Sequence, residues 1–250
     1  VPQQLIARLG AEGLHWWSAD VQAQRDEPDG SFDSQALLAR LGDGDTLTLA
    51  VPGEHVGLRQ VTTATAERRY LDDSLPYLLE EELAADVDTL HFVHAPAGAE
   101  RVAVALAGRG RVEQWLEELA SCEVEAERVI PEPLLLPLVQ GGICVVLERG
   151  RAIVRTGMYS GFAVEDQLLA AALAMHIEQL EEPPLQLLVY GGEESDVAAF
   201  VPEGLRGLVS WHRGNFVTAS QHCSDPGEQL NLLQGQFKPR LPWGDWWRAW

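Results

Sequence analysis

Short apolar runs of strand length alternate with stretches of helical periodicity along the whole chain. Residues 5–9 and 14–21 flank Gly10 and Gly13 and predict a hairpin. Further strands are expected at 46–51, 56–61, 89–93, 102–106, 129–130, 143–147, 152–155, 161–164, 185–190 and 205–211. A chain in which strands and helices alternate in this way is typical of an α/β fold.

The period of 3.6 residues predicts helices at 34–41, 71–83, 112–119 and 165–180. Ser34 is the expected N-cap of the first helix, which should stop at Gly42. In the second, leucines at 71, 75, 78, 79 and 83 fall on one helical face. Pro76 lies inside that pattern, so it should kink the helix or split it in two.

The order of strands followed by a helix occurs twice. The second series begins after Gly141 and Gly142, which interrupt the apolar pattern. The sequence therefore predicts two related α/β halves with a boundary near Gly141.

The composition of the chain excludes some classes of protein. Of 250 residues, 46% are hydrophobic, which excludes a wholly disordered chain, and the formal net charge of −20 argues against binding to nucleic acid. Cys122, Cys144 and Cys223 are odd in number and far apart, so they form neither a disulfide framework nor a metal knuckle. A reducing compartment fits this cysteine usage.

The last thirteen residues differ from the rest of the chain. They carry three basic residues against Asp245, a charge of +2, and four of the eight tryptophans. Cationic groups mixed with tryptophan are typical of the cytoplasmic face of a membrane. We therefore favour a membrane-proximal segment over a tail that packs its tryptophans on its own core. The residues concerned are Lys238, Arg240, Trp243, Trp246, Trp247, Arg248 and Trp250.

An acidic cluster lies on or beside the predicted helix at 71–83. It contains Asp72, Asp73, Glu80, Glu81, Glu82 and Asp86. Consecutive carboxylates point in different directions on a helix, so they are no paired acid and base. Two interpretations stay open, a solvated helix face and a docking surface for a basic partner.

Strong catalytic motifs are missing from the sequence. GxxxxGK[ST], HExxH, GxSxG and GxGxxG do not occur. His91 and His94 should point to opposite faces of a strand, which makes a poor metal pair. His222 and Cys223, with Asp225, read as a surface turn rather than a nucleophile site. We assign no catalytic, cofactor or metal-binding residue.

An ordered set of segments nevertheless resembles a known family. The segments that carry the resemblance are VPGEHVGLRQVTTAT (51–65), LPYLLEEELAADVDTLHF (75–92), 102–137, RTGMYSGFAVE (155–165), LLVYGG (187–192) and NLLQGQFKPR (231–240). Over about 200 residues they are similar to the cytoplasmic domain of type II secretion system protein L, an actin-like protein of the bacterial inner membrane. The chain is more distantly similar to the pilus assembly protein PilM and the division protein FtsA.

The resemblance implies an actin-like α/β fold whose nucleotide site is degenerate. Residues 1–54 and 109–140 would form the first half, and 141–237 the second half. An inserted small α+β domain would span 55–108, and 238–250 would be a juxtamembrane tail that precedes a single transmembrane helix.

The resemblance also implies a function. The chain would be a non-catalytic inner-membrane platform subunit that binds the N-terminal domain of the secretion ATPase, protein E. Protein M and other inner-membrane subunits would be further partners, and a homodimer is expected in the full assembly. Neither a cofactor nor nucleic acid is expected.

Actin-like ATPases hold phosphate and Mg²⁺ with glycine-rich hairpins that carry an Asp. The hairpin at 9–13 has no Asp here, and Glu148 is the only acid of the hairpin at 147–151. We therefore expect a vestigial site. The alternatives are an actin-like ATPase or small-molecule kinase that uses the cleft between the halves, and a polymerising cytoskeletal protein.

Overall fold

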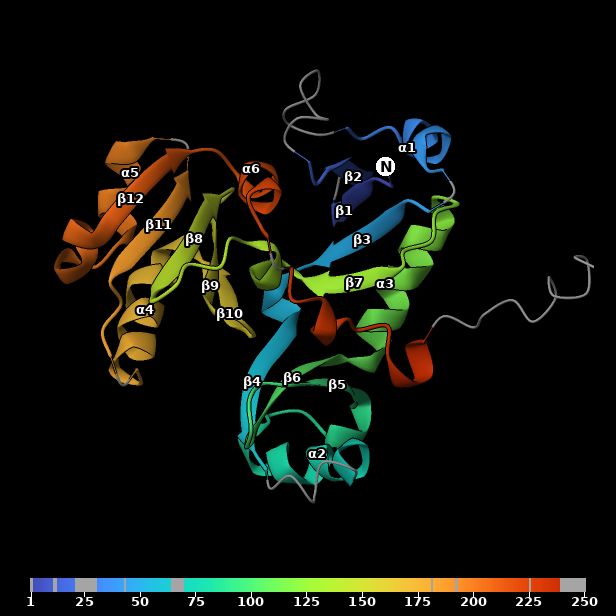
Figure 1. The fold of residues 1–250 in the computed structure, drawn as a ribbon, viewed down its shortest axis with the longest axis horizontal. Helices are drawn as coiled ribbons and strands as arrows, with labels where there is room; N and C mark the ends of the chain where they lie inside the picture. The colour runs from blue at the N-terminus through green and yellow to red at the C-terminus, as the bar shows by residue number, and fades with distance from the viewer. Residues whose placement is uncertain are drawn as a thin grey trace, which may run out of the picture.

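The computed structural model shows three β-sheets joined around a shared core (Figure 1). It describes residues 2–10, 13–20, 31–42, 44–63, 70–180, 182–191, 193–224 and 226–238.

The first sheet has the strand order β2-β1-β3-β7. A hairpin, β1 (Gln4–Gly10) with β2 (Gly13–Ser18), is followed by the parallel strands β3 (Thr46–Val51) and β7 (Arg128–Pro131). Two helices accompany this sheet, α1 (Ser34–Arg40) and α3 (Arg109–Ser121).

The second sheet has the order β10-β9-β8-β11-β12. The hairpin of β8 (Gly142–Glu148) with β9 (Arg151–Gly157) is again followed by two parallel strands. These are β11 (Gln186–Gly191) and β12 (Val209–Arg213), while β10 (Ser160–Glu165) is added antiparallel to β9. The two sheets therefore share one topology, a hairpin and two parallel strands.

Three helices flank the second sheet. Ile143 and Val145 of β8 pack with α4 (Leu169–Glu178) and α5 (Glu194–Phe200). The alternate residues of β8, Cys144 and Val146, face the other way and join α6 (Phe216–Gln221) in the core shared with the first sheet. This alternation is expected of a strand buried on both faces.

The third sheet is small and antiparallel, with β6 (Arg101–Gly108) between β4 (Val56–Thr62) and β5 (Leu90–Pro96). Helix α2 (Leu71–Leu79) covers one of its faces with Leu71, Leu75 and Leu79. The small residues of the opposite face belong to the main core, where they allow the two layers to approach closely.

Four local predictions need correction. Asp33, not Ser34, caps α1, because its carboxylate accepts from the backbone N–H groups of Gln35 and Ala36. Of the two outcomes expected at Pro76 the split is wrong, because α2 continues through it, and the helix ends at Leu79 instead of residue 83. Leu78 is 53% exposed because it lies at the edge of the apolar stripe. Residues 203–208 form a 3-10 helix instead of a strand, after Pro202 and with two glycines that favour turning.

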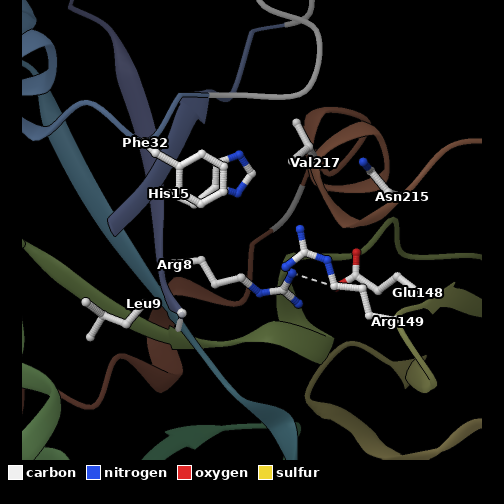
Figure 2. Close-up of a pocket in the computed structure, with 9 residues that line it drawn as sticks. Arg8, Leu9, His15, Phe32, Glu148, Arg149, Asn215 and Val217 are labelled. Carbon is white, nitrogen blue, oxygen red and sulfur yellow. Dashed lines mark hydrogen bonds and ion pairs between the residues drawn. The ribbon is translucent and has the colours of Figure 1, made fainter. Parts of the chain in front are cut away.

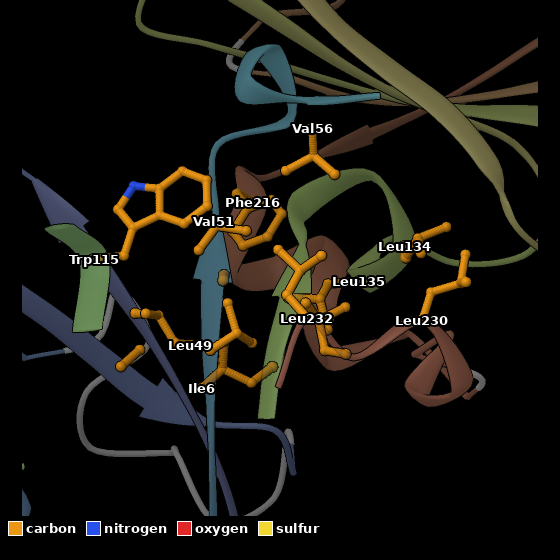
Figure 3. Packing of buried hydrophobic residues seen from close by; sticks show 14 of the residues in the cluster. Ile6, Leu49, Val51, Val56, Trp115, Leu134, Leu135, Phe216, Leu230 and Leu232 are labelled. Atoms are coloured by element: carbon orange, nitrogen blue, oxygen red, sulfur yellow. The ribbon is translucent and has the colours of Figure 1, made fainter. Parts of the chain in front are cut away.

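Residues 226–238, here called the strap, tie the third sheet to the first. The N–H of Leu232 donates to the carbonyl of Val129 on β7 (2.9 Å), and the Leu232 carbonyl lies 2.8 Å from Nε2 of His91 on β5. Leu230 and Leu232 are fully buried beside Leu134 and Leu135 (Figure 3). The strap thus covers the edge of β7 in the first sheet, and it also contacts His91 on β5 of the third sheet.

Lys238 is exposed at the end of the strap. The other predicted membrane-proximal residues, Arg240, Trp243, Trp246, Trp247, Arg248 and Trp250, lie outside the described residues. Across the part of the chain that the structure describes, no helix is both long enough and apolar enough to cross a membrane.

Candidate functional site

The two hairpins that begin the two related sheets approach each other at the centre of the molecule. Arg8 comes from β1 of the first sheet, and Glu148 comes from β8 of the second. Their ion pair spans the gap between the sheets (Figure 2). Beside it lies a cavity of about 360 Å³ lined by Arg8, Leu9, Gly10, His15, Phe32, Glu148, Arg149, Asn215 and Val217.

Arg8 contacts two carboxylates, Glu148 of the second half and Glu132 of its own half. Its Nη1 lies 2.5 Å from Oε1 of Glu148, and its Nε donates to Oε1 of Glu132 at 2.6 Å. The guanidinium also covers the ring of Phe216 at 4.4 Å. Glu148 is oriented in turn by the N–H of Phe216, which donates to its second oxygen at 3.1 Å. Charge-assisted contacts of this kind are the strong class of hydrogen bond.

Glu132 is the buried centre of the network, with no exposed side-chain surface. Its second oxygen accepts from Nη2 of Arg151 at 2.7 Å and from the N–H of Gly53 at 3.3 Å. Burial raises the pKa of the Glu132 carboxyl, and the guanidinium groups of Arg8 and Arg151 more than offset this, so the pKa lies below its usual range. Arg151 also pairs with both carboxylate oxygens of Glu54, at 2.6 Å each.

A further buried arginine joins β9 to the segment after β7. Arg155 is 1% exposed, and its Nη1 donates to the carbonyls of Leu134 (3.0 Å) and Leu136 (2.6 Å). Its Nη2 donates to the carbonyl of Met158 at 3.0 Å. The guanidinium satisfies carbonyl groups that burial would otherwise leave without partners.

Two ion pairs at this centre, Arg8 with Glu148 and Arg151 with Glu132, join the two halves, and we call them the clamp. Glu148, the one acid that the sequence offers for the second hairpin, is held by Arg8 and by a backbone N–H. An incoming Mg²⁺–phosphate group would have to displace these charge-assisted bonds. In the part of the chain that the structure describes, no three His, Cys, Asp or Glu side chains are grouped to hold a metal ion.

Sequence reasoning identified Glu148 but missed Arg8, Glu132, Arg151 and Arg155. A signal was present, because Arg8, Glu132 and Arg155 are charged residues inside apolar runs, LIARLG, VIPEPLLL and AIVRTG. Charged residues are almost never buried without partners, so each of these positions predicts a partner from elsewhere in the chain.

The predicted acidic cluster is only partly described. Glu80, Glu81 and Glu82 form an exposed 3-10 turn at the carboxyl end of α2. Asp72 and Asp73 belong to α2, but their side chains lie outside the description. Next to the acidic turn, α2 exposes Tyr77 (75%) and Leu78.

The side chains that were considered above as metal ligands or as a nucleophile site have structural contacts where the structure describes them. His91 is buried by the strap and meets Phe237 edge to face, with ring centroids 4.8 Å apart. His222 directs Nδ1 to the carbonyl of Thr218 at 2.8 Å. Cys223 Sγ lies 3.6 Å from Nη1 of Arg155. Asp225 lies outside the described residues.

Two sheets of one topology that meet at their hairpins, with a small sheet inserted between strands of the first, define an actin-like fold. The chain belongs to the family described as Type II secretion system (T2SS), protein L, whose model matches residues 5–240.

Relatives and solved structures agree with this assignment. Type II secretion system protein L of Dickeya chrysanthemi is 25% identical over 246 residues, covering 96% of this chain and 58% of that protein. The Vibrio cholerae protein of the same name is 29% identical over 262 residues, covering 100% of this chain and 62% of that protein. This chain therefore spans about three fifths of the length of the curated relatives it matches.

Among solved structures, the chain resembles the cytoplasmic domain of EpsL, an inner-membrane component of the type II secretion system of Vibrio cholerae. The TM-score is 0.70 at 24% identity, covering 94% of this chain and 100% of that one. A PilM–PilN type IV pilus biogenesis complex matches with a TM-score of 0.53 at 14% identity, covering 91% of this chain and 96% of that one.

Proposed function

We propose that this chain is a non-catalytic, cytoplasmic platform domain of an inner-membrane subunit, which recruits and anchors the secretion ATPase, protein E. Protein M and other inner-membrane subunits are its further partners, and it forms a homodimer in the assembly. Membership of the protein L family supports this proposal. The observation that carries its non-catalytic part is the ion-pair clamp between the halves, in which Arg8 pairs with Glu148 and Arg151 pairs with Glu132.

The clamp favours a platform because side chains of the protein itself join the two halves. Arg8 of the first half pairs with Glu148 of the second, and Arg151 of the second half pairs with Glu132 of the first. A domain fixed in one arrangement presents a constant surface to its partners.

The acidic end of α2 is the surface that we assign to ATPase binding. Glu80, Glu81 and Glu82 are exposed beside Tyr77 and Leu78, so apolar anchors lie next to a charged rim. Interfaces combine these features, because buried aromatic residues supply affinity and charges supply association rate and orientation.

Calorimetric titration with the N-terminal domain of the cognate ATPase tests this assignment. We expect a saturable complex of about micromolar affinity or tighter. Reversing Glu80, Glu81 and Glu82 to Lys should weaken it at least tenfold and remove its salt sensitivity, because the attraction is electrostatic.

The matched control reverses three exposed acids on another helix, Glu113, Glu117 and Glu118 of α3. This variant has the same net charge as the first, so a change in overall charge affects both equally. Equal affinities of wild type and the α2 variant would show that the acidic turn is solvated surface. No complex with wild type would remove ATPase recruitment from the proposal.

The cavity beside Arg8 and Glu148 is the observation that favours the alternative, an ATPase or kinase. That alternative predicts that millimolar Mg–ATP raises the melting temperature, because a ligand that binds only the folded state stabilises it. The clamp predicts no shift for wild type. A clear rise would replace the platform proposal with the nucleotide-dependent one.

A further inference from the structure

Helix α2 has an exposed face beside its acidic turn. The leucines of its other face pack on the third sheet. Tyr70, Tyr77 and Leu78 fall within about 100° of one another by helical geometry, and each is more than half exposed. Large apolar side chains that gather on the surface next to charged residues are typical of a binding site for another polypeptide segment. We call this surface, together with the turn Glu80–Glu82, the α2 face.

The strap brings the end of the described chain to the third sheet, which carries α2 (Figure 1). The ring of Phe237 meets that of His91 on β5, with centroids 4.8 Å apart. Leu90, the residue before His91, packs with α2 on the opposite side of the sheet. Layers of this kind lie about 10 Å apart, whereas residues 239–250 can span up to about 40 Å. The tail, residues 238–250, is therefore long enough to reach the α2 face.

The composition of the tail complements the α2 face. The tail carries three basic residues against Asp245, and it holds four of the eight tryptophans of the chain. The α2 face offers exposed carboxylates and exposed tyrosine rings. Opposite charges orient such a contact, and packed aromatic rings supply its affinity. Because the tail is tethered, its effective concentration at the face is about millimolar, so a weak contact is enough.

We propose that the tail folds back over the α2 face and competes there with the secretion ATPase. This inference rests on the proposed function, because it takes the acidic turn as the ATPase-binding surface. The same basic and tryptophan side chains favour an anionic membrane surface. A membrane therefore draws the tail away and frees the α2 face, so that the ATPase is recruited only by a subunit whose tail lies at the membrane.

Cysteine cross-linking in the absence of the ATPase tests the contact. Ala84→Cys places a thiol directly after the acidic turn, and Ala249→Cys places one in the tail without removing a basic or tryptophan side chain. With diamide as oxidant, this pair should form an intramolecular disulfide about fivefold faster, or more, than Ala120→Cys with Ala249→Cys. Ala120 is also exposed, and it lies on α3, which adjoins β5 as well. The natural thiols stay in place, and peptide mapping identifies each disulfide.

Charge and membrane supply two controls on the same readout. Reversing the three glutamates of the acidic turn to Lys should slow the cross-link about threefold or more, because the tail is then repelled. Reversing Glu113, Glu117 and Glu118 of α3 changes the net charge equally and should leave the rate unchanged. Phosphatidylglycerol vesicles should slow the cross-link to the rate of the control pair, and uncharged phosphatidylcholine vesicles should not.

Calorimetry with the N-terminal domain of the ATPase tests the competition. If the tail covers the α2 face in about two thirds of the molecules, deleting residues 239–250 lowers the apparent dissociation constant about threefold. Replacing the same residues by a Gly/Ser segment of equal length should have the same effect, because the competition depends on the side chains of the tail.

Equal cross-linking rates for the two cysteine pairs, or a rate that rises in proportion to protein concentration, would overturn the docking of the tail on its own chain. No ATPase is present in that experiment, so recruitment is untouched. A fast cross-link with an ATPase affinity that the deletion leaves unchanged would overturn the competition. If neither protein binds the ATPase, the proposed function fails and the competition with it, while the cross-link still decides the docking.

Discussion

Arg8 and Glu132 show how a buried carboxylate finds its partner within the first half of the fold. Both interrupt apolar sequence, and they meet although 124 residues separate them. Their pairing does not follow from spacing, because nothing in a sequence places the end of β1 next to the turn after β7. The sequence does show that such residues need partners, since a buried charge without one is strongly destabilising.

Replacing Arg8 by Met should destabilise the protein by about 3 kcal/mol at about pH 7, because it leaves the buried Glu132 with a single guanidinium. In wild type the lowered pKa of Glu132 gives stability that is present above its unfolded pKa and lost as pH falls. In the variant the pKa of Glu132 rises, so the stability difference should shrink between about pH 7 and about pH 4. Urea unfolding at both pH values measures it.

The control is Arg213→Met, which removes the pair with Glu193. These side chains are 75% and 65% exposed, so the expected change is within about 0.5 kcal/mol. If Arg8→Met lowers the free energy of unfolding equally little, or if its effect does not vary with pH, the ion pairs of Arg8 do not stabilise the fold.

At the scale of elements, strands with a clear apolar run were predictable, and segments whose order depends on their partners were not. The strand at Thr46–Val51 and the three hairpin strands from β8 to β10 were predicted within two residues of their bounds. The prediction missed α6, which has six residues, four of them buried, so it shows no polar face and no helical period. The strap is also missed, because its order comes from partners on β5 and β7.

Leu232→Ala should cost about 3 kcal/mol, because the side chain is fully buried where the strap crosses the core. Hydrogen exchange should also speed up at the amide of Val129, which donates to Asn231 of the strap. Leu185→Ala is the control for the same chemical change, and its side chain is 77% exposed. Protection of Val129 that stays at the wild-type level would contradict this account of the strap.

At the scale of the whole molecule, an acidic body is followed by a basic, tryptophan-rich tail. The actin-like fold with two related halves was predictable through the family resemblance, and the structure and comparisons confirm it. The alternation of strands and helices had indicated only an α/β protein. The contact between the halves needed coordinates, because its ion pair joins Arg8 to Glu148, which is 140 positions away.

Deleting residues 238–250 should change the free energy of unfolding by less than about 1 kcal/mol, because the buried side chains of the strap end before this segment. It should remove most binding to anionic lipid vesicles, because the basic and tryptophan side chains are lost together. Vesicle co-sedimentation measures this, with uncharged vesicles as the control. Equal binding of both proteins to anionic vesicles would rule out the tail as the membrane-proximal segment.

The strap follows the strands of all three sheets in the sequence, which affects folding during synthesis. The second sheet can pair its strands once residue 213 has been made, but the edge of β7 and the side of β5 next to His91 stay open until residues 230–237 emerge. A ribosome that stalls just before this point would release a chain with exposed strand edges, which are prone to aggregate. The segment that covers these strand edges is therefore synthesised after every strand that the structure describes.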